Sequence, residues 1–258
     1  MGHERIGVLP KSKRWRSIVA DVGSLTGGEY DVGTIAGETL RATRSRLRWF
    51  QDDPAPLEAF SFLVELSVRA RTGGLSGMPG LDDGGPLTPL RLVRVLRSRL
   101  ASIDSSPEYR ELSAAAGADA LALWYQTHRV QDVSLFEGFG CADSTWDALQ
   151  SGRGFCELSR LFFSKIVERY LRYFLERELS AVGPSLSHSD QVRADLQSYL
   201  ADVSQHALET SKITQSLAAG WFNKHAQKGM PPKSSIRGVF NYALTKLRDE
   251  MTREGSRA

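Results

Sequence analysis

The chain of 258 residues contains only two cysteines, Cys141 and Cys156. They form no CxxC pair and have no metal-ligand spacing, so the sequence favours neither a disulfide framework nor a structural zinc site. Cys156 falls near the start of an apolar segment, where a buried thiol is the expected state. Low cysteine content is usual in a reducing compartment, and we expect a cytoplasmic location.

Long uncharged apolar runs are also lacking. No segment approaches the ~18 uncharged residues that a membrane-spanning helix needs. The first fifteen residues, up to Trp15, are charged and have no apolar centre of the kind found in a signal peptide. The sequence therefore predicts that no membrane is a partner.

Familiar catalytic motifs are absent. There is no GxxxxGK[ST] phosphate loop, no GxGxxG, no HExxH and no GxSxG. No histidine lies three or four residues from another histidine or a cysteine, and the five are scattered: His3, His128, His188, His206 and His225. We therefore expect no catalytic residue, no cofactor and no metal site, and the chain leans towards a non-enzymatic role. An enzyme of unfamiliar type is a second alternative, whose polar groups would have to come from separate helices, such as His128, Glu137, Asp143 and His206.

Apolar residues recur at helical spacing along the chain, and no alternating strand pattern or internal repeat is present. The sequence predicts an all-α fold, an irregular multi-helix bundle of about eight helices around a central hydrophobic helix (153–180). That helix is apolar on nearly three sides, and its polar row is expected to be a solvated seam. The row has members four residues apart: Arg160, Ser164, Glu168, Arg172 and Glu176.

The other helices are expected to alternate with breaks. Asp52–Pro56 offers both an N-cap and a first-turn proline for the helix that follows. Trp221–Ser235 is expected to interrupt the helices near the C-terminus. The bounds of these helices follow from apolar spacing and caps. The expected helices cover roughly 13–22, 32–50, 57–71, 90–103, 105–128, 189–220 and 236–251.

The segment Thr72–Pro89 holds six glycines and three prolines, which is the composition of a loop or linker. It divides the chain into an N-terminal helical segment with a basic arm (1–71), the loop or linker itself (72–89), and a main helical bundle (90–258). A single continuous domain that includes 1–71 is the alternative.

The net charge of +3 is unevenly distributed. Residues 1–50 hold nine Lys/Arg and five Asp/Glu, residues 221–258 hold eight and three, and the middle holds sixteen and twenty-two, so the three parts carry +4, +5 and −6. Basic ends of this kind can contact the phosphates of nucleic acid. The candidate nucleic-acid-binding residues are Lys11, Lys13, Arg14 and Arg16 in the arm, and Lys224, Lys228, Lys233 and Arg237 near the C-terminus.

The C-terminal basic region also contains aromatic residues, and it joins two expected helices. A helix–turn–helix would place Ser234, Ser235, Arg237 and Asn241 at the front of a recognition helix. The stiff Met230-Pro231-Pro232 turn and the helix-weakening Gly238 argue against that geometry.

Besides an enzyme of unfamiliar type, two functions remain open. The leading hypothesis is a non-enzymatic helical protein that acts through protein–protein interaction, as an accessory component of a bacterial multiprotein system. The opening stretch RIGVLPKSKRW (5–15) resembles uncharacterised bacterial proteins encoded in defence gene clusters, a resemblance that implies no site residue. The alternative is a nucleic-acid-binding protein that uses the basic arm and the 221–237 region. The partner is thus expected to be another protein or a nucleic acid, and the oligomeric state is left open.

Overall fold

A computed structural model gives the fold. It describes residues 50–81, 84–128, 145–182, 218–227 and 229–254, with isolated positions elsewhere. All regular secondary structure in this described part is helical, and it comprises six α-helices and two short 3₁₀-helices. The prediction of an all-α multi-helix protein is therefore confirmed.

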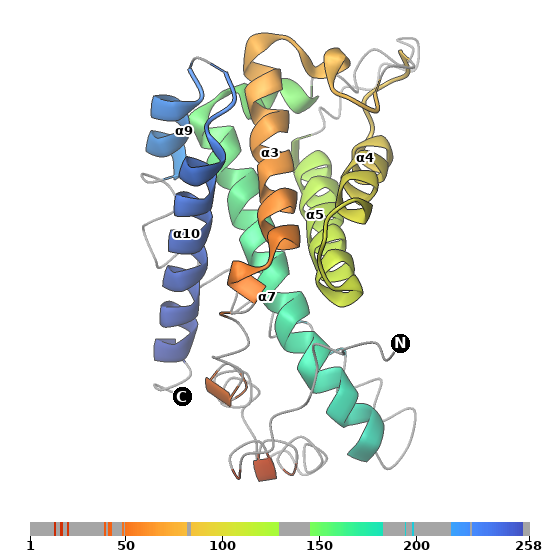
Figure 1. Cartoon of the computed structure of the whole chain (residues 1–258), viewed down its shortest axis with the longest axis vertical. Coiled ribbons are helices and arrows are strands. Elements are labelled where there is room, and N and C mark those ends of the chain that lie inside the picture. Colours follow the sequence, from red (N-terminus) through yellow and green to blue (C-terminus); the bar gives the residue numbers. More distant parts are fainter. Residues whose placement is uncertain are drawn as a thin grey trace. The chain divides into compact units, whose positions relative to one another are not determined.

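Figure 1 shows the helices of the described part. The expected helices at 57–71, 90–103, 105–128, 153–180 and 236–251 are all present. Those expected at 13–22, 32–50 and most of 189–220 lie largely outside the described residues. The observed elements are α3 (Pro54–Thr72), η2 (Leu75–Gly77), α4 (Pro89–Ala101), α5 (Pro107–His128), η3 (Ala148–Gln150), α7 (Gly152–Val182), α9 (Ala219–His225) and α10 (Lys233–Glu254).

The contacts divide the chain into two compact units. The larger unit comprises residues 53–163 and 212–243, and the smaller comprises residues 1–52, 164–211 and 244–258. Helices α7 and α10 each contribute residues to both. The residues before and after the loop at 72–89 belong to the larger unit. The division of the sequence into 1–71, 72–89 and 90–258 stays a prediction.

Helix α3 begins as its sequence dictates. Asp53 is the N-cap, and its Oδ1 accepts a hydrogen bond of 2.8 Å from the backbone N–H of Ala55. Pro54 follows at the first helical position, where its missing N–H costs nothing. Gly73 then ends the helix in the left-handed conformation, with a φ of 70°.

Phe60 on α3 lies at the centre of the larger unit. Its ring centroid is 5.1 Å from that of Phe163 and 6.2 Å from that of Phe155, both on α7. The ring of Phe240 on α10 lies 5.8 Å away. All of these rings are buried. In Figure 1, α3 accordingly stands between α4–α5 on one side and α9–α10 on the other.

The glycine-rich loop is anchored to the larger unit. Met78, Leu81 and Leu87 are buried. The indole N–H of Trp146 donates to the carbonyl oxygen of Leu87 at 2.8 Å, and both groups are buried. Arg91 on α4 donates to the carbonyl oxygens of Leu81, Gly85 and Pro86. The loop is therefore a packed part of the unit on both sides of positions 82 and 83.

The prediction that the polar row of the central helix is solvated is wrong at its middle positions. Ser164 and Glu168 are buried, with 8% and 2% of their surfaces exposed. The Glu168 carboxylate lies 2.5 Å from the ammonium of Lys165, three residues earlier, and this contact stabilises the buried charge. Arg160 and Arg172 are half-buried, and the side chain of Glu176 lies outside the described residues.

The smaller unit has aromatic contacts of its own. The rings of Phe50 and Tyr170 lie 5.9 Å apart, and those of Tyr170 and Phe174 lie 5.1 Å apart. The side-chain amide of Gln51 donates to the hydroxyl oxygen of Thr245 at 3.1 Å.

Candidate functional site

Three of the cations expected to bind nucleic acid lie exposed on α9 and α10: Lys224, Lys233 and Arg237. We call them the α9–α10 basic surface. None of the three forms an ion pair with a residue that the structure describes. Lys233 and Arg237 are four residues apart on one helix, so their side chains are neighbours.

Helix α9 is held against the first turns of α7. Phe222 is buried, and its ring stacks on that of Phe155 with 4.6 Å between the centroids. The guanidinium of Arg71, from the end of α3, lies 5.5 Å from the same ring. A Cβ on Gly152 would come within 2.6 Å of the Asn223 side-chain amide, so the two helices approach closely here. These contacts place Lys224 on a rigid support.

The turn between α9 and α10 is also fixed by side chains. The indole N–H of Trp221 donates to the Ser235 hydroxyl at 3.0 Å. Gly229 has a φ of 112°, and Pro231 is buried. The interruption expected at Trp221–Ser235 is therefore wrong at its beginning, since Ala219–His225 is helical. The local sequence alone does not require a helix here. Burial of Phe222 stabilises it.

The front of α10 is poorly suited to read bases. Ser235 already accepts the hydrogen bond from Trp221, and Asn241 is half-buried. Ser234 and Arg237 remain exposed, together with Gly238. This set offers contacts to phosphate rather than the paired donors and acceptors that base recognition requires.

A further sequence signal strengthens the charge of this surface. Between Thr210 and Arg248 the chain contains seven Lys/Arg and no Asp/Glu. The net charge of residues 221–258 understates this feature, because that range also includes the three acids that follow Arg248. Nearby carboxylates along the chain therefore cannot neutralise the α9–α10 basic surface.

Two arginines of α4 are engaged with acids. Arg97 donates through both terminal nitrogens to Glu111, at 3.1 and 3.0 Å. Arg99 pairs with Glu65 at 2.6 Å. The three cations of the α9–α10 basic surface differ from these two arginines, because none of them forms an ion pair with a described acid.

The basic arm is described at only two of its four candidate residues. Lys13 and Arg16 are helical and exposed, and they belong to the smaller unit. Lys11 and Arg14 lie outside the described residues, as does Lys228. The arm therefore stays a prediction.

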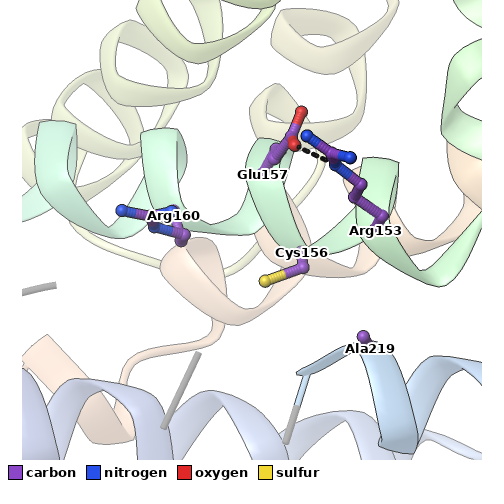
Figure 2. Close-up of a pocket in the computed structure, with 5 residues that line it drawn as sticks. All are labelled: Arg153, Cys156, Glu157, Arg160 and Ala219. Carbon is purple, nitrogen blue, oxygen red and sulfur yellow. Dashed lines mark hydrogen bonds and ion pairs between the residues drawn. The ribbon is translucent and has the colours of Figure 1, made fainter. Parts of the chain in front are cut away.

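A pocket of about 360 Å³ opens between α7 and the start of α9 (Figure 2). It is lined by Arg153, Cys156, Glu157, Arg160 and Ala219. Burial raises the pKa of the Cys156 thiol to about 11, against a smaller opposing effect of Arg160. The thiol is therefore neutral at physiological pH, which excludes Cys156 as a ready nucleophile.

Glu157 connects the pocket to the end of α5. Its Oε1 accepts from the Arg153 Nε at 3.0 Å, and its Oε2 lies 3.1 Å from the His128 Nε2. The His128 Nδ1 lies 3.0 Å from the carbonyl oxygen of Trp124, and the two rings are stacked at 3.6 Å. Both imidazole nitrogens thus lie within hydrogen-bond distance of oxygen atoms.

The structure does not test the enzyme alternative, because only one of its four polar groups is described. His128 is described, whereas Glu137, Asp143 and His206 lie outside it. Among the described residues there is also no group of three or more His, Cys, Asp or Glu that could hold a metal ion.

The described fold and surface define an all-α protein with a rigidly supported basic surface. No helix in the described part is long and apolar enough to cross a membrane. Comparisons with protein-family models, curated proteins and solved structures gave no match, so the functional argument rests on the site itself.

Proposed function

We propose that the chain is a nucleic-acid-binding protein that contacts the phosphate backbone through its α9–α10 basic surface. The observation that carries the proposal is the exposure of Lys224, Lys233 and Arg237 within an acid-free stretch of the chain. Lysine and arginine that meet no carboxylate neutralise phosphates and release their counterions, which drives binding.

Rigidity supports the same proposal. Phe222 fixes α9 against α7, and the Trp221–Ser235 hydrogen bond ties the first turn of α10 to α9. Cations on such elements lose little conformational freedom on binding. Since the front of α10 offers few groups for base recognition, we expect affinity to depend weakly on sequence.

Two matched double variants test the proposal. K233Q/R237Q removes two charges from the α9–α10 basic surface, whereas R94Q/R97Q removes two from the exposed side of α4. Binding of a fluorescent 20-base-pair DNA and of a 20-nucleotide RNA is followed by anisotropy at low salt. We expect K233Q/R237Q to weaken binding of at least one probe by roughly tenfold or more, and R94Q/R97Q to leave it within about twofold.

Equal affinities of the two variants would contradict the assignment of the surface, and no binding by the unmodified chain would contradict the function. Thermal unfolding of all three proteins checks that the variants are folded.

Protein–protein interaction, with an accessory role in a bacterial multiprotein system, stays a prediction. Exposed large apolar side chains in the described part are Leu90, Met230 and Tyr242, on different elements. They are separate positions rather than a continuous apolar face, so they favour a protein partner less than the charge favours nucleic acid. A chain that binds neither nucleic-acid probe would return this hypothesis to first place.

A further inference from the structure

The pocket beside α9 has features of a ligand site that the nucleic-acid proposal does not use. One wall is a side of α7 and the other begins at Ala219. Its volume of about 360 Å³ lies within the range of ~300–1,000 Å³ typical of small-molecule sites. Figure 2 shows Cys156 projecting from α7 on the side that faces Ala219, with Arg153 and Arg160 to either side of it.

The two arginines flank the pocket along the axis of α7. They are seven residues apart, which is close to two turns, so they lie on one side of the helix roughly 10 Å apart along the axis. Arg153 is exposed and uses its Nε for Glu157, while its terminal nitrogens make no hydrogen bond to a described residue. These terminal nitrogens are the donors that bind an oxyanion in two-point geometry.

The one carboxylate in the lining is already engaged. Glu157 has Arg153 on one oxygen and His128 on the other. Its negative charge is therefore held by its own partners and repels an incoming anion less than an isolated carboxylate would. The lining itself carries two positive charges, on Arg153 and Arg160, and one negative charge, on Glu157.

The remaining wall is uncharged. Cys156 and Ala219 present a thiol and a methyl group, and the raised pKa of Cys156 keeps that thiol neutral. A neutral thiol does not compete for the arginines as a thiolate would. This wall suits the uncharged part of a ligand whose charged group lies nearer the arginines.

We propose that this pocket binds a small organic anion, with a phosphate or carboxylate group at the terminal nitrogens of Arg153, within reach of the positive charge of Arg160, and an uncharged body against Cys156 and Ala219. The volume argues against a bare inorganic ion, which would leave most of the space to water. The inference does not rest on nucleic-acid binding, since neither Lys233 nor Arg237 lines the pocket.

Cys156 gives the test a local reporter. In a C141A background it is the single thiol, and its rate of modification by N-ethylmaleimide is followed by intact mass at about pH 9, because the thiolate is the reacting form and burial raises the pKa of this thiol to about 11. The probes are AMP for a phosphate source, glutarate for a carboxylate source and inorganic phosphate for the bare ion, each at millimolar concentration. We expect AMP or glutarate to slow modification by at least about tenfold at saturation, and phosphate to slow it less.

Variants assign the effect to the arginines. R160Q is expected to lower the affinity of the protecting probe by roughly tenfold or more, since it removes a positive charge beside the bound anion. R160K retains the charge and is expected to retain part of the affinity, which keeps the test informative if R160Q folds poorly. R94Q, on the exposed side of α4, serves as the control and is expected to bind as the unmodified chain does.

The probes distinguish the possible sources of the anionic group. Protection by AMP assigns a phosphate ligand, and protection by glutarate alone assigns a carboxylate ligand. Unchanged modification with both organic probes, or equal affinity in R160Q and the unmodified chain by titration calorimetry, would overturn the proposal. K233Q/R237Q is expected to leave probe binding intact, so failure of one proposal is distinguishable from failure of the other.

Discussion

Glu65 lies between two arginines that come from different helices. Its Oε1 accepts from the Arg69 Nε at 2.7 Å, and its Oε2 accepts from the Arg99 Nη1 at 2.6 Å. The Arg99 guanidinium also lies 5.2 Å from the centre of the Phe62 ring. Burial raises the pKa of Glu65, but the hydrogen bonds and charges of Arg99 and Arg69 outweigh it and hold this pKa below its ordinary value.

This lowered pKa makes the stability dependent on pH. The ionised carboxylate stabilises the fold above the unfolded-state pKa, and the contribution is lost as the pH falls through the lower folded-state pKa. We expect E65Q to reduce the free energy of unfolding at pH 7 by about 1–2 kcal/mol, since the group is only partly buried. The difference between E65Q and the unmodified chain should shrink in urea titrations as the pH falls through the acidic range.

E111Q is the matched control for Glu65. Glu111 also pairs with an arginine, Arg97, but its side chain is 64% exposed. We expect its loss to cost no more than about 0.5 kcal/mol at pH 7. An effect of E111Q as large as that of E65Q would contradict the assigned role of burial.

Gly117 sets how closely α4 and α5 approach. A Cβ at this position would lie 2.4 Å from the Cδ2 of Leu96 on α4, which is buried. We expect G117A to destabilise the fold by about 1–3 kcal/mol, because a packed side chain must move. Chemical denaturation measures the change.

Gly238 provides the opposite case. It lies exposed within α10, and a Cβ there would meet no heavy atom within 4 Å among the described surroundings. G238A is expected to raise stability by about 0.5–1 kcal/mol, because alanine loses less entropy in a helix. Equal changes in the free energy of unfolding for G117A and G238A would mean that the contact with Leu96 does not cause the destabilisation of G117A.

At the level of elements, the helices with strong apolar spacing were predictable, and the central helix is the clearest of them. Burial along its polar row was not predictable. Arg160 and Arg172 at the two ends of this stretch are half-buried, whereas Ser164 and Glu168 between them are buried. Such local burial depends on which other segments cover the helix, and the spacing of polar residues along one helix does not specify these segments.

The candidate site was predictable in part. Exposed lysine and arginine follow from composition, and Lys224, Lys233 and Arg237 are exposed. Helix α9 and the pocket depend on contacts between segments far apart in sequence, such as Phe155 with Phe222 and Arg153 with Ala219. No local pattern specifies such pairs, so the sequence alone did not reveal them.

The start of α3 is coupled to the connection before α5. The same Oδ1 of Asp53 accepts from the Ala55 N–H and, at 2.7 Å, from the Ser105 hydroxyl. We expect D53A to lower the free energy of unfolding by about 1–2 kcal/mol, because the cap and a second hydrogen bond are both lost. D53N keeps an oxygen acceptor and is expected to lose less than half as much. Equal losses, measured by urea unfolding, would show that charge rather than capping is responsible.

For the molecule as a whole, charge is the feature that connects sequence to function. The chain is acidic in its middle and basic at its ends, and the longest acid-free basic stretch includes α9 and the front of α10. This distribution predicts that nucleic acid is bound by the C-terminal region rather than by α4 or α7. It also predicts strong sensitivity of binding to salt.

The salt dependence of DNA binding decides whether Lys233 and Arg237 contact phosphates. Affinity for a 20-base-pair duplex is measured from low to moderate salt for the unmodified chain, K233Q/R237Q and R94Q/R97Q. Each phosphate contact contributes about 0.9 to the slope of log affinity against log salt, so K233Q/R237Q should reduce the magnitude of the slope by about 1.8. R94Q/R97Q should leave it unchanged. A slope for K233Q/R237Q equal to that of the unmodified chain would contradict the assignment of the α9–α10 basic surface.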